Sequence, residues 1–152
     1  MNRFILLFLF LIAATGVNAQ SDNPKYDQKL AESLGGDDYG MKRYVLVILK
    51  TGTNKTTDKK LIDSLFSGHM ANIGRLAASN KLVVAGPLKT NEKTYRGIFI
   101  FNVSTIEEAN QLLITDPAVK NKLLDAELFE WYGSAALPVY LESHSKIEKK
   151  KM

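Results

Sequence analysis

The sequence predicts an α+β fold of the ferredoxin-like type, with four strands and two main helices in the order β-α-β-β-α-β. Short apolar runs of strand length alternate with longer segments in which apolar residues recur at helical spacing. Turn residues separate these segments, and the two helical patterns fall in the split positions that this fold requires. Right-handed crossovers would place both helices on one face of a four-stranded sheet.

The first half of the domain contains a strand, a helix and a second strand. Residues 43–50, RYVLVILK, form a β-branched apolar run that is typical of a strand. Residues 58–79 carry an apolar stripe at helical spacing, and Asp58 or Thr57 can cap its start. Asn80 suits the left-handed position that often follows a helix. Residues 81–88, KLVVAGPL, then predict a strand that ends at Gly86-Pro87.

The second half repeats this alternation. Residues 95–103, YRGIFIFNV, predict the third strand. Ser104 or Thr105 can cap the helix that follows, which stops before Asp116-Pro117. Residues 116–124 add a short helical piece, and residues 125–135, DAELFEWYGSA, predict the last strand.

Both faces of the predicted sheet are apolar. A sheet with one solvated face alternates apolar and polar residues. In YVLVIL and GIFIF, by contrast, both the odd and the even positions of the strand are apolar. An uncovered face of this kind would be a sticky patch. We therefore expect a homodimer in which two sheets pack face to face, as in a dimeric α+β barrel. The alternative is that the N-terminal leader or the C-terminal tail covers this face.

The two ends of the chain are expected to lie outside the domain. Residues 1–19 combine Arg3, an apolar run and small residues before Gln20, which predicts a cleaved signal peptide and a secreted or periplasmic protein. The apolar run is shorter than the roughly 20 residues that span a bilayer, so we expect no membrane span after cleavage; a retained anchor is the alternative. Residues 20–40 predict a flexible polar leader, 41–138 a single domain and 139–152 a basic tail.

Composition excludes several classes of function. The chain has no cysteine, which rules out disulfides, thiolate catalysis and sulfur-based metal sites, and it has only two histidines. The net charge is +4, but the excess lies in Arg3 and in the lysines of the last eight residues. The domain itself is close to neutral and lacks the basic face of a nucleic-acid binder. We expect no nucleic-acid partner, no metal and no cofactor.

A histidine interrupts the apolar stripe of the first helix. In residues 65–77, LFSGHMANIGRLA, His69 stands where the periodicity predicts an apolar side chain. One interpretation is a core histidine that makes one or two structural hydrogen bonds. The other is a partly buried imidazole that takes and returns a proton. The pattern alone leaves both open.

The order of the motifs resembles the YCII-related proteins, which are small ferredoxin-like domains that pair as dimeric α+β barrels. The motifs are GHMANIGRLA, KLVVAGPL, IFIF and EEANQLLITDPAV, and the resemblance covers about residues 42–131. It implies an acid–base pocket formed by His69 and Asp116. Phe66 departs from the family, whose members often carry a polar or basic residue three positions before the histidine.

Each remaining candidate also has a structural interpretation. Asp116 precedes a proline, an arrangement that favours a helix N-cap, and it can also orient His69 if one oxygen caps and the other faces the imidazole. Gly86 and Pro87 match the family's AGP turn; they either end the strand or let a ligand approach the backbone.

Trp131 and Tyr132 form an aromatic pair in the last strand. They are either core or dimer-interface residues, or walls of an apolar ligand pocket in which the Tyr132 hydroxyl is a polar handle.

The resemblance implies a homodimer that binds a small, partly apolar organic molecule. The predicted signal peptide adds secretion, which is not typical of the better-known cytoplasmic members and indicates a secreted subgroup. His69 would act as general base or acid with Asp116 in support, in a cofactor-free isomerisation, elimination or hydrolysis. The alternative is a non-catalytic ligand-binding or purely structural dimeric module.

Overall fold

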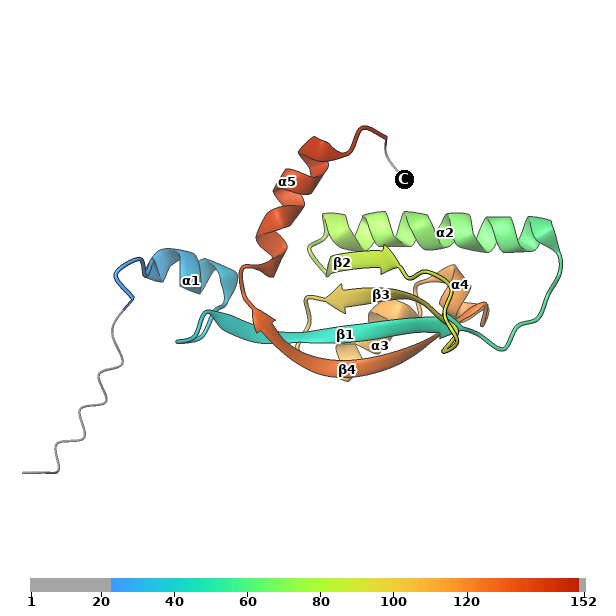
Figure 1. The fold of residues 1–152 in the computed structure, drawn as a ribbon, viewed down its shortest axis with the longest axis horizontal. Coiled ribbons are helices and arrows are strands. Elements are labelled where there is room, and N and C mark those ends of the chain that lie inside the picture. The colour runs from blue at the N-terminus through green and yellow to red at the C-terminus, as the bar shows by residue number, and fades with distance from the viewer. Residues whose placement is uncertain (1–22, 151–152) are drawn as a thin grey trace, which may run out of the picture.

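Four antiparallel strands form one sheet in the order β2-β3-β1-β4 (Figure 1). The computed structural model describes residues 23–150, so the predicted signal peptide lies outside the described residues. The strands are β1 (Met41–Thr51), β2 (Leu82–Pro87), β3 (Tyr95–Phe101) and β4 (Leu124–Ser134). Helix α2 (Lys59–Ala78) connects β1 to β2, while α3 (Ile106–Leu113) and α4 (Pro117–Lys120) connect β3 to β4. The predicted α+β ferredoxin-like fold is confirmed.

Local signals place the ends of the long helix α2 where the sequence predicts them. The Asp58 carboxylate accepts the backbone N–H groups of Lys60 and Leu61 and so caps the first turn. Asn80, two residues beyond the helix, has a φ of 54°, the left-handed conformation expected there. None of the helices among residues 23–150 is both long and apolar enough to cross a membrane.

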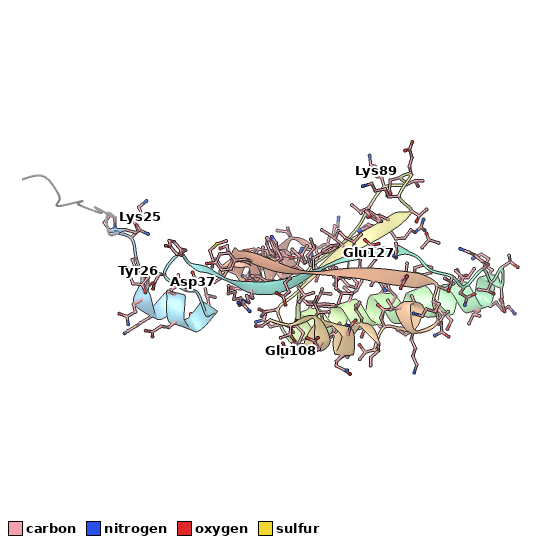
Figure 2. All side chains as sticks on the ribbon, turned by 90° about the horizontal axis from the view of Figure 1, so that it is seen from below. Lys25, Tyr26, Asp37, Lys89, Glu108 and Glu127 are labelled. Atoms are coloured by element: carbon pink, nitrogen blue, oxygen red, sulfur yellow. The ribbon has the colours of Figure 1, made fainter. Side chains whose placement is uncertain are left out.

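The core lies between the helices and one face of the sheet. Helices α2 and α3 pack on this face, and Figure 2 shows Glu108 of α3 and Glu127 of β4 on opposite sides of the sheet. Strands β1 and β3 turn alternate side chains toward the helices, which contribute further apolar residues. The main buried members are Val45, Val47, Leu49, Phe99, Phe101, Leu76, Ala109, Leu113 and Ala118.

The other face of the sheet is also apolar and carries no helical layer. Leu46 of β1 lies opposite Ile100 of β3 and Phe129 of β4. Phe129 is 49% exposed and Trp131 is 37% exposed. Helices α1 (Gln28–Leu34) and α5 (Tyr140–Ile147) flank the domain, and none of their residues is buried.

The described part of the predicted leader is attached to the ends of β1 and β4. Asp27 caps α1 by accepting the N–H of Leu30. The Lys42 ammonium donates to the last-turn carbonyl of Leu34 at 3.0 Å, and the N–H of Ala135 donates to the carbonyl of Gly40 at 2.9 Å. The leader, which the sequence predicts to be flexible, therefore contains a capped helix with its own contacts to the sheet.

The predicted basic tail likewise begins with structure. A 3-10 turn (Leu137–Val139) leads into α5, and the Tyr140 hydroxyl donates to the carbonyl of Val83 in β2. Burial of this hydroxyl raises the pKa of Tyr140. The only helix-spaced ion pair in α5 joins Lys146 to Glu142 at 2.7 Å and is largely exposed, so it adds little stability.

We expect Gly133→Ala to displace the indole of Trp131 from the sheet. A β-carbon at Gly133 would lie 2.4–2.8 Å from three indole carbons. The ring would have to leave its contact with Tyr44, where the two centroids are 5.6 Å apart. The free energy of unfolding should fall by about 0.5–1.5 kcal/mol, the contribution of an aromatic pair, because the half-exposed ring can turn away.

Trp131 is the single tryptophan, so its fluorescence reports this displacement directly. Gly86→Ala is the matched control, because a β-carbon there would meet no atom within 4 Å. An unchanged emission spectrum in Gly133→Ala would show that the indole is not held against the strand.

Candidate functional site

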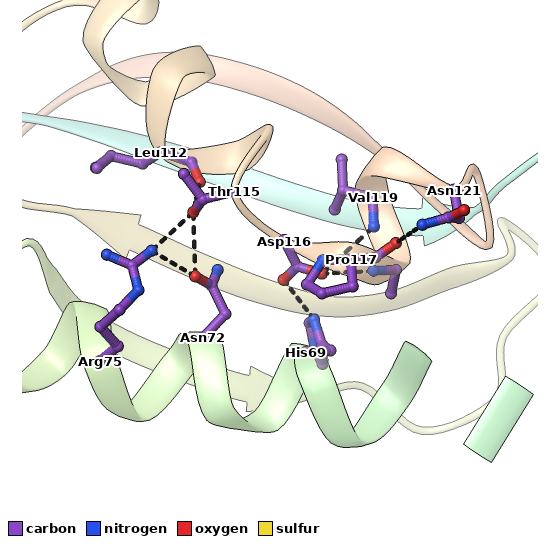
Figure 3. A network of polar contacts seen from close by, with 10 residues as sticks. His69, Asn72, Arg75, Leu112, Thr115, Asp116, Pro117, Val119 and Asn121 are labelled. Carbon is purple, nitrogen blue, oxygen red and sulfur yellow. Dashed lines mark hydrogen bonds and ion pairs between the residues drawn. The ribbon is translucent and has the colours of Figure 1, made fainter. Parts of the chain in front are cut away.

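His69 and Asp116 form a buried pair between α2 and the start of α4 (Figure 3). The Nδ1 atom of His69 lies 2.6 Å from Oδ2 of Asp116. His69 is 8% exposed and Asp116 is completely buried. His69 belongs to the buried stripe of α2, together with Leu65, Asn72 and Leu76. The helical periodicity therefore places the imidazole on the side of α2 that faces the core.

The carboxylate of Asp116 makes both contacts that the sequence analysis considered, the helix cap and the contact with His69. Its Oδ1 accepts the N–H groups of Ala118 at 2.9 Å and Val119 at 3.3 Å, which caps α4. Its Oδ2 remains for His69. Pro117 at the first helical position needs no hydrogen bond to its own nitrogen, so the two capping bonds go to the next residues. The cap fixes the direction in which the second oxygen points.

This arrangement assigns the proton on the imidazole. An ionised carboxylate can only accept hydrogen bonds, so Nδ1 donates and Nε2 carries the lone pair of the neutral ring. None of the residues 23–150 hydrogen-bonds Nε2, and in that part of the chain no buried side-chain nitrogen or oxygen lacks a partner. Nε2 therefore reaches solvent and can act as a base.

Two aromatic rings enclose the imidazole. The ring of Phe99 in β3 stacks on it, with centroids 5.8 Å apart and an interplanar angle of 22°. The ring of Phe66, one turn earlier on α2, approaches edge-on at 6.1 Å. Phe66 is 36% exposed, so it forms the outer wall of the site. Apolar walls limit the water around the pair and strengthen its electrostatic interaction.

A second polar cluster lies beside the pair and was not expected from the sequence. One guanidinium nitrogen of Arg75 donates to Oδ1 of Asn72 at 2.6 Å and to the hydroxyl of Thr115 at 2.9 Å. The Thr115 hydroxyl lies 3.0 Å from the same Asn72 oxygen and 2.6 Å from the carbonyl of Leu112. Asn72 is 7% exposed. The sequence offered one signal for this cluster, which is that Asn72 follows His69 by three residues on the same stripe of α2.

A close helix contact lies on the other side of the pair. A β-carbon at Gly68 would lie 2.8 Å from Cγ of Pro117. The absence of a side chain at Gly68 therefore lets α4 approach α2 at the residue before His69.

The other four candidate residues lie elsewhere. Gly86 faces the open side of the sheet opposite Ile98, and Pro87 pairs with Gly97 at the end of the edge strand β2, where proline is tolerated. Within residues 23–150, no hydrogen bond or ring contact joins Gly86, Pro87, Trp131 or Tyr132 to His69 or Asp116.

Trp131 and Tyr132 lie near the far end of β4. Together with Arg43 and Glu130 they line a surface hollow of about 380 Å³, which includes neither His69 nor Asp116. The Tyr132 hydroxyl donates to the Asp37 carboxylate of the leader. This hydrogen bond lowers the pKa of Asp37 and raises the pKa of Tyr132. The Tyr132 side chain therefore contacts the leader and not the His69 site.

Across residues 23–150, no three His, Cys, Asp or Glu side chains are grouped closely enough to hold a metal ion.

Comparisons with known proteins give matches to solved structures but not to a family or a curated protein. No family model matches the chain, and no curated protein matches it. A solved structure of 5-chloro-2-hydroxyhydroquinone dehydrochlorinase (TftG) from Burkholderia phenoliruptrix AC1100, in complex with 2,5-dihydroxybenzoquinone, matches with a TM-score of 0.42 and 20% sequence identity. The match covers 57% of this chain and 92% of the other. With a TM-score below 0.5, this likeness assigns no activity and no ligand to the chain.

We expect Asp116→Asn to keep the α4 cap but to move the imidazole proton. Asparagine caps helices as well as aspartate does, and its oxygen would stay on the N–H groups of Ala118 and Val119. Its NH2 group would then face Nδ1 of His69, which must become an acceptor. The proton would move to Nε2. The ¹⁵N NMR shifts of the imidazole distinguish the two tautomers, with the exposed His144 as an internal reference.

Asp116→Ala is the contrasting variant, because it removes both contacts. Its free energy of unfolding should fall by about 2–4 kcal/mol, roughly 1 from the cap and the rest from the unpartnered imidazole N–H. If Asp116→Asn kept the proton on Nδ1, the tautomer assigned to His69 would be wrong.

Proposed function

We propose that this chain is a YCII-like domain that binds a small organic molecule next to His69 and transfers a proton through Nε2. Asp116 positions the imidazole and stabilises its protonated form. The reaction needs no cofactor and is an isomerisation, an elimination or a hydrolysis. The protein is secreted or periplasmic after removal of residues 1–19.

The observation that carries the proposal is that the two imidazole nitrogens have different surroundings. Nδ1 is 2.6 Å from a fully buried carboxylate, whereas Nε2 has no partner among the described side chains and is not closed off from solvent. A base held by a buried acceptor on one side and free on the other is the arrangement that general acid–base catalysis requires.

The proton balance is the same for each reaction class. Nε2 takes a proton from an acidic C–H or from water, and the imidazolium that forms keeps its Nδ1–H bond to the Asp116 carboxylate. The proton then returns to another substrate atom in an isomerisation, or to the leaving group in an elimination or hydrolysis. The enzyme ends each cycle with Nε2 unprotonated.

Access to Nε2 depends on Phe66. The imidazole is one-tenth exposed as a side chain, and the exposed ring of Phe66 meets it edge-on. Rotation of this one ring would widen the opening without moving the backbone. Phe66 also makes the approach apolar, which suits a partly apolar substrate.

The alternative is a module that binds a ligand or another chain without turnover. The enclosure of His69 between Phe66 and Phe99 supports this alternative. The two functions differ in whether His69 removes a proton from a bound molecule.

We expect the mature protein to exchange or remove a substrate proton in a manner that depends on His69. Enolisable ketones, activated aryl lactones and halogenated hydroquinones are incubated with the protein in D2O, and ¹H NMR follows the loss of C–H signals and the appearance of products. His69→Gln should lower the rate by about 10²–10⁴, the usual contribution of a general base.

His144→Gln is the matched control, because His144 is exposed on α5 and has no contact with the site. Equal rates for the native protein and His69→Gln, or no reaction in any class, would leave the non-catalytic alternative.

We further propose that a second copy covers the open face of the sheet. Its support is an apolar band on the face of the sheet opposite the core, made of the partly exposed Leu46, Ile48, Ile98 and Ile100 and the exposed Phe129. Burial of such a band by an identical band would give a twofold interface with a hydrophobic centre.

Ile100→Glu should therefore convert the dimer into a monomer, because Ile100 lies between Val84 and Leu46 in the middle of the band. Sedimentation velocity of the mature chain gives the mass directly. Ala71→Glu adds the same charge at an exposed position of α2 and should leave the mass unchanged. A monomeric native protein would contradict the proposal.

A further inference from the structure

We infer that Gly68, Asn72 and Arg75 are positioning residues that set the distance between His69 and Asp116. Figure 3 shows His69, Asn72 and Arg75 of α2 facing the residues just before α4. Gly68 meets Pro117, His69 meets Asp116, and the pair Asn72 and Arg75 meets Thr115. The contact between His69 and Asp116, whose catalytic role rests on the proposed function, is therefore the middle one of three.

The contact at Gly68 sets how closely α4 can approach. The Asp116 carboxylate moves as one body with α4, because Oδ1 is bonded to two of that helix's own N–H groups. The position of α4 against α2 thus determines where Oδ2 lies. A methyl group at position 68 would lie 2.8 Å from the Pro117 ring. To restore ordinary carbon contact, α4 would have to withdraw by roughly 0.6 Å or more.

Such a withdrawal is large compared with the tolerance of the hydrogen bond. The distance from Nδ1 to Oδ2 is 2.6 Å, which is short for a charge-assisted bond. A bond longer by the same amount would lie at the weak end of the normal range. The size of residue 68 therefore controls the strength of the catalytic pair.

The contact at Thr115 prevents the opposite motion, in which the connection swings away from α2. Arg75 donates to Thr115 at 2.9 Å and to the buried oxygen of Asn72 at 2.6 Å. The Thr115 hydroxyl in turn has acceptors in Asn72 and Leu112. Arg75 makes no ion pair with a carboxylate of the described chain. Its hydrogen bonds go instead to the residue next to Asp116.

The test compares two matched pairs of variants by the state of the His69 proton. Gly68→Ala is paired with Gly74→Ala on the same helix, where a β-carbon meets no atom within 4 Å. Thr115→Val removes the hydroxyl from an exposed residue with little change of shape, and Thr115→Ser restores it. The readouts are the imidazole ¹⁵N shifts, the exchange rate of the Nδ1 proton with solvent, and the melting temperature of each variant.

We expect Gly68→Ala and Thr115→Val to lose the Nδ1–H signal or to exchange it about tenfold faster, since hydrogen bonds weaken steeply as they lengthen. Gly74→Ala and Thr115→Ser should keep the native signal. A change of melting temperature without a change in the Nδ1 proton would show a purely structural role and overturn the inference. A change in only one of the two test variants would overturn the two-sided arrangement.

If Gly68→Ala fails to fold, the test depends on Thr115→Val alone. A native Nδ1–H signal in Thr115→Val would then overturn the inference. These readouts need no substrate, so they also separate the inference from the proposed function. A protein without turnover can still show the coupling, and a protein with turnover can lack it.

Discussion

The structure on the helical side of the sheet depends on one contact, the bond between a buried imidazole and a buried carboxylate. Leaving a buried polar partner unpaired costs roughly 3–5 kcal/mol when that partner is charged. The chain meets this constraint with a complete set of donors and acceptors around Asp116, three N–H groups on two oxygens. The start of α4 and the middle of α2 are thereby held together, and the rest of the helical layer packs around them.

The same contact explains why a small helix of four residues stands at this place. A helix as short as α4 (Pro117–Lys120) has little stability of its own. It persists because Asp116 caps it, Pro117 starts it and Ala118 buries itself in the core. A single residue thus links a local signal, the cap, to a contact between segments that are 47 residues apart in the chain.

Much of this fold was predictable because its elements have strong local signals. Apolar runs set the strands, and Asp58, Asn80 and Thr105 mark helix ends where the structure has them. The pairing of His69 with Asp116 entered through a family resemblance, since spacing alone does not bring distant residues together. The cluster around Asn72 was missed because its partners lie on another helix connection, and the leader was underestimated because its attachments are single hydrogen bonds to distant strand ends.

The placement of Trp131 shows the limit of inference from residue type. Aromatic residues near a strand end suit a pocket wall and an interface equally well, and only the register separates the two. Opposite Tyr44, the indole lies on the open face of the sheet, whereas Phe99 directs the His69 ring to the helical face. Within one chain the sheet itself lies between them. The buried His69–Asp116 pair, enclosed by α2, β3 and α4, and the aromatic open face are therefore two separate surfaces. Under the proposed function, the exposed ring of Phe66 marks the side from which a substrate would approach His69.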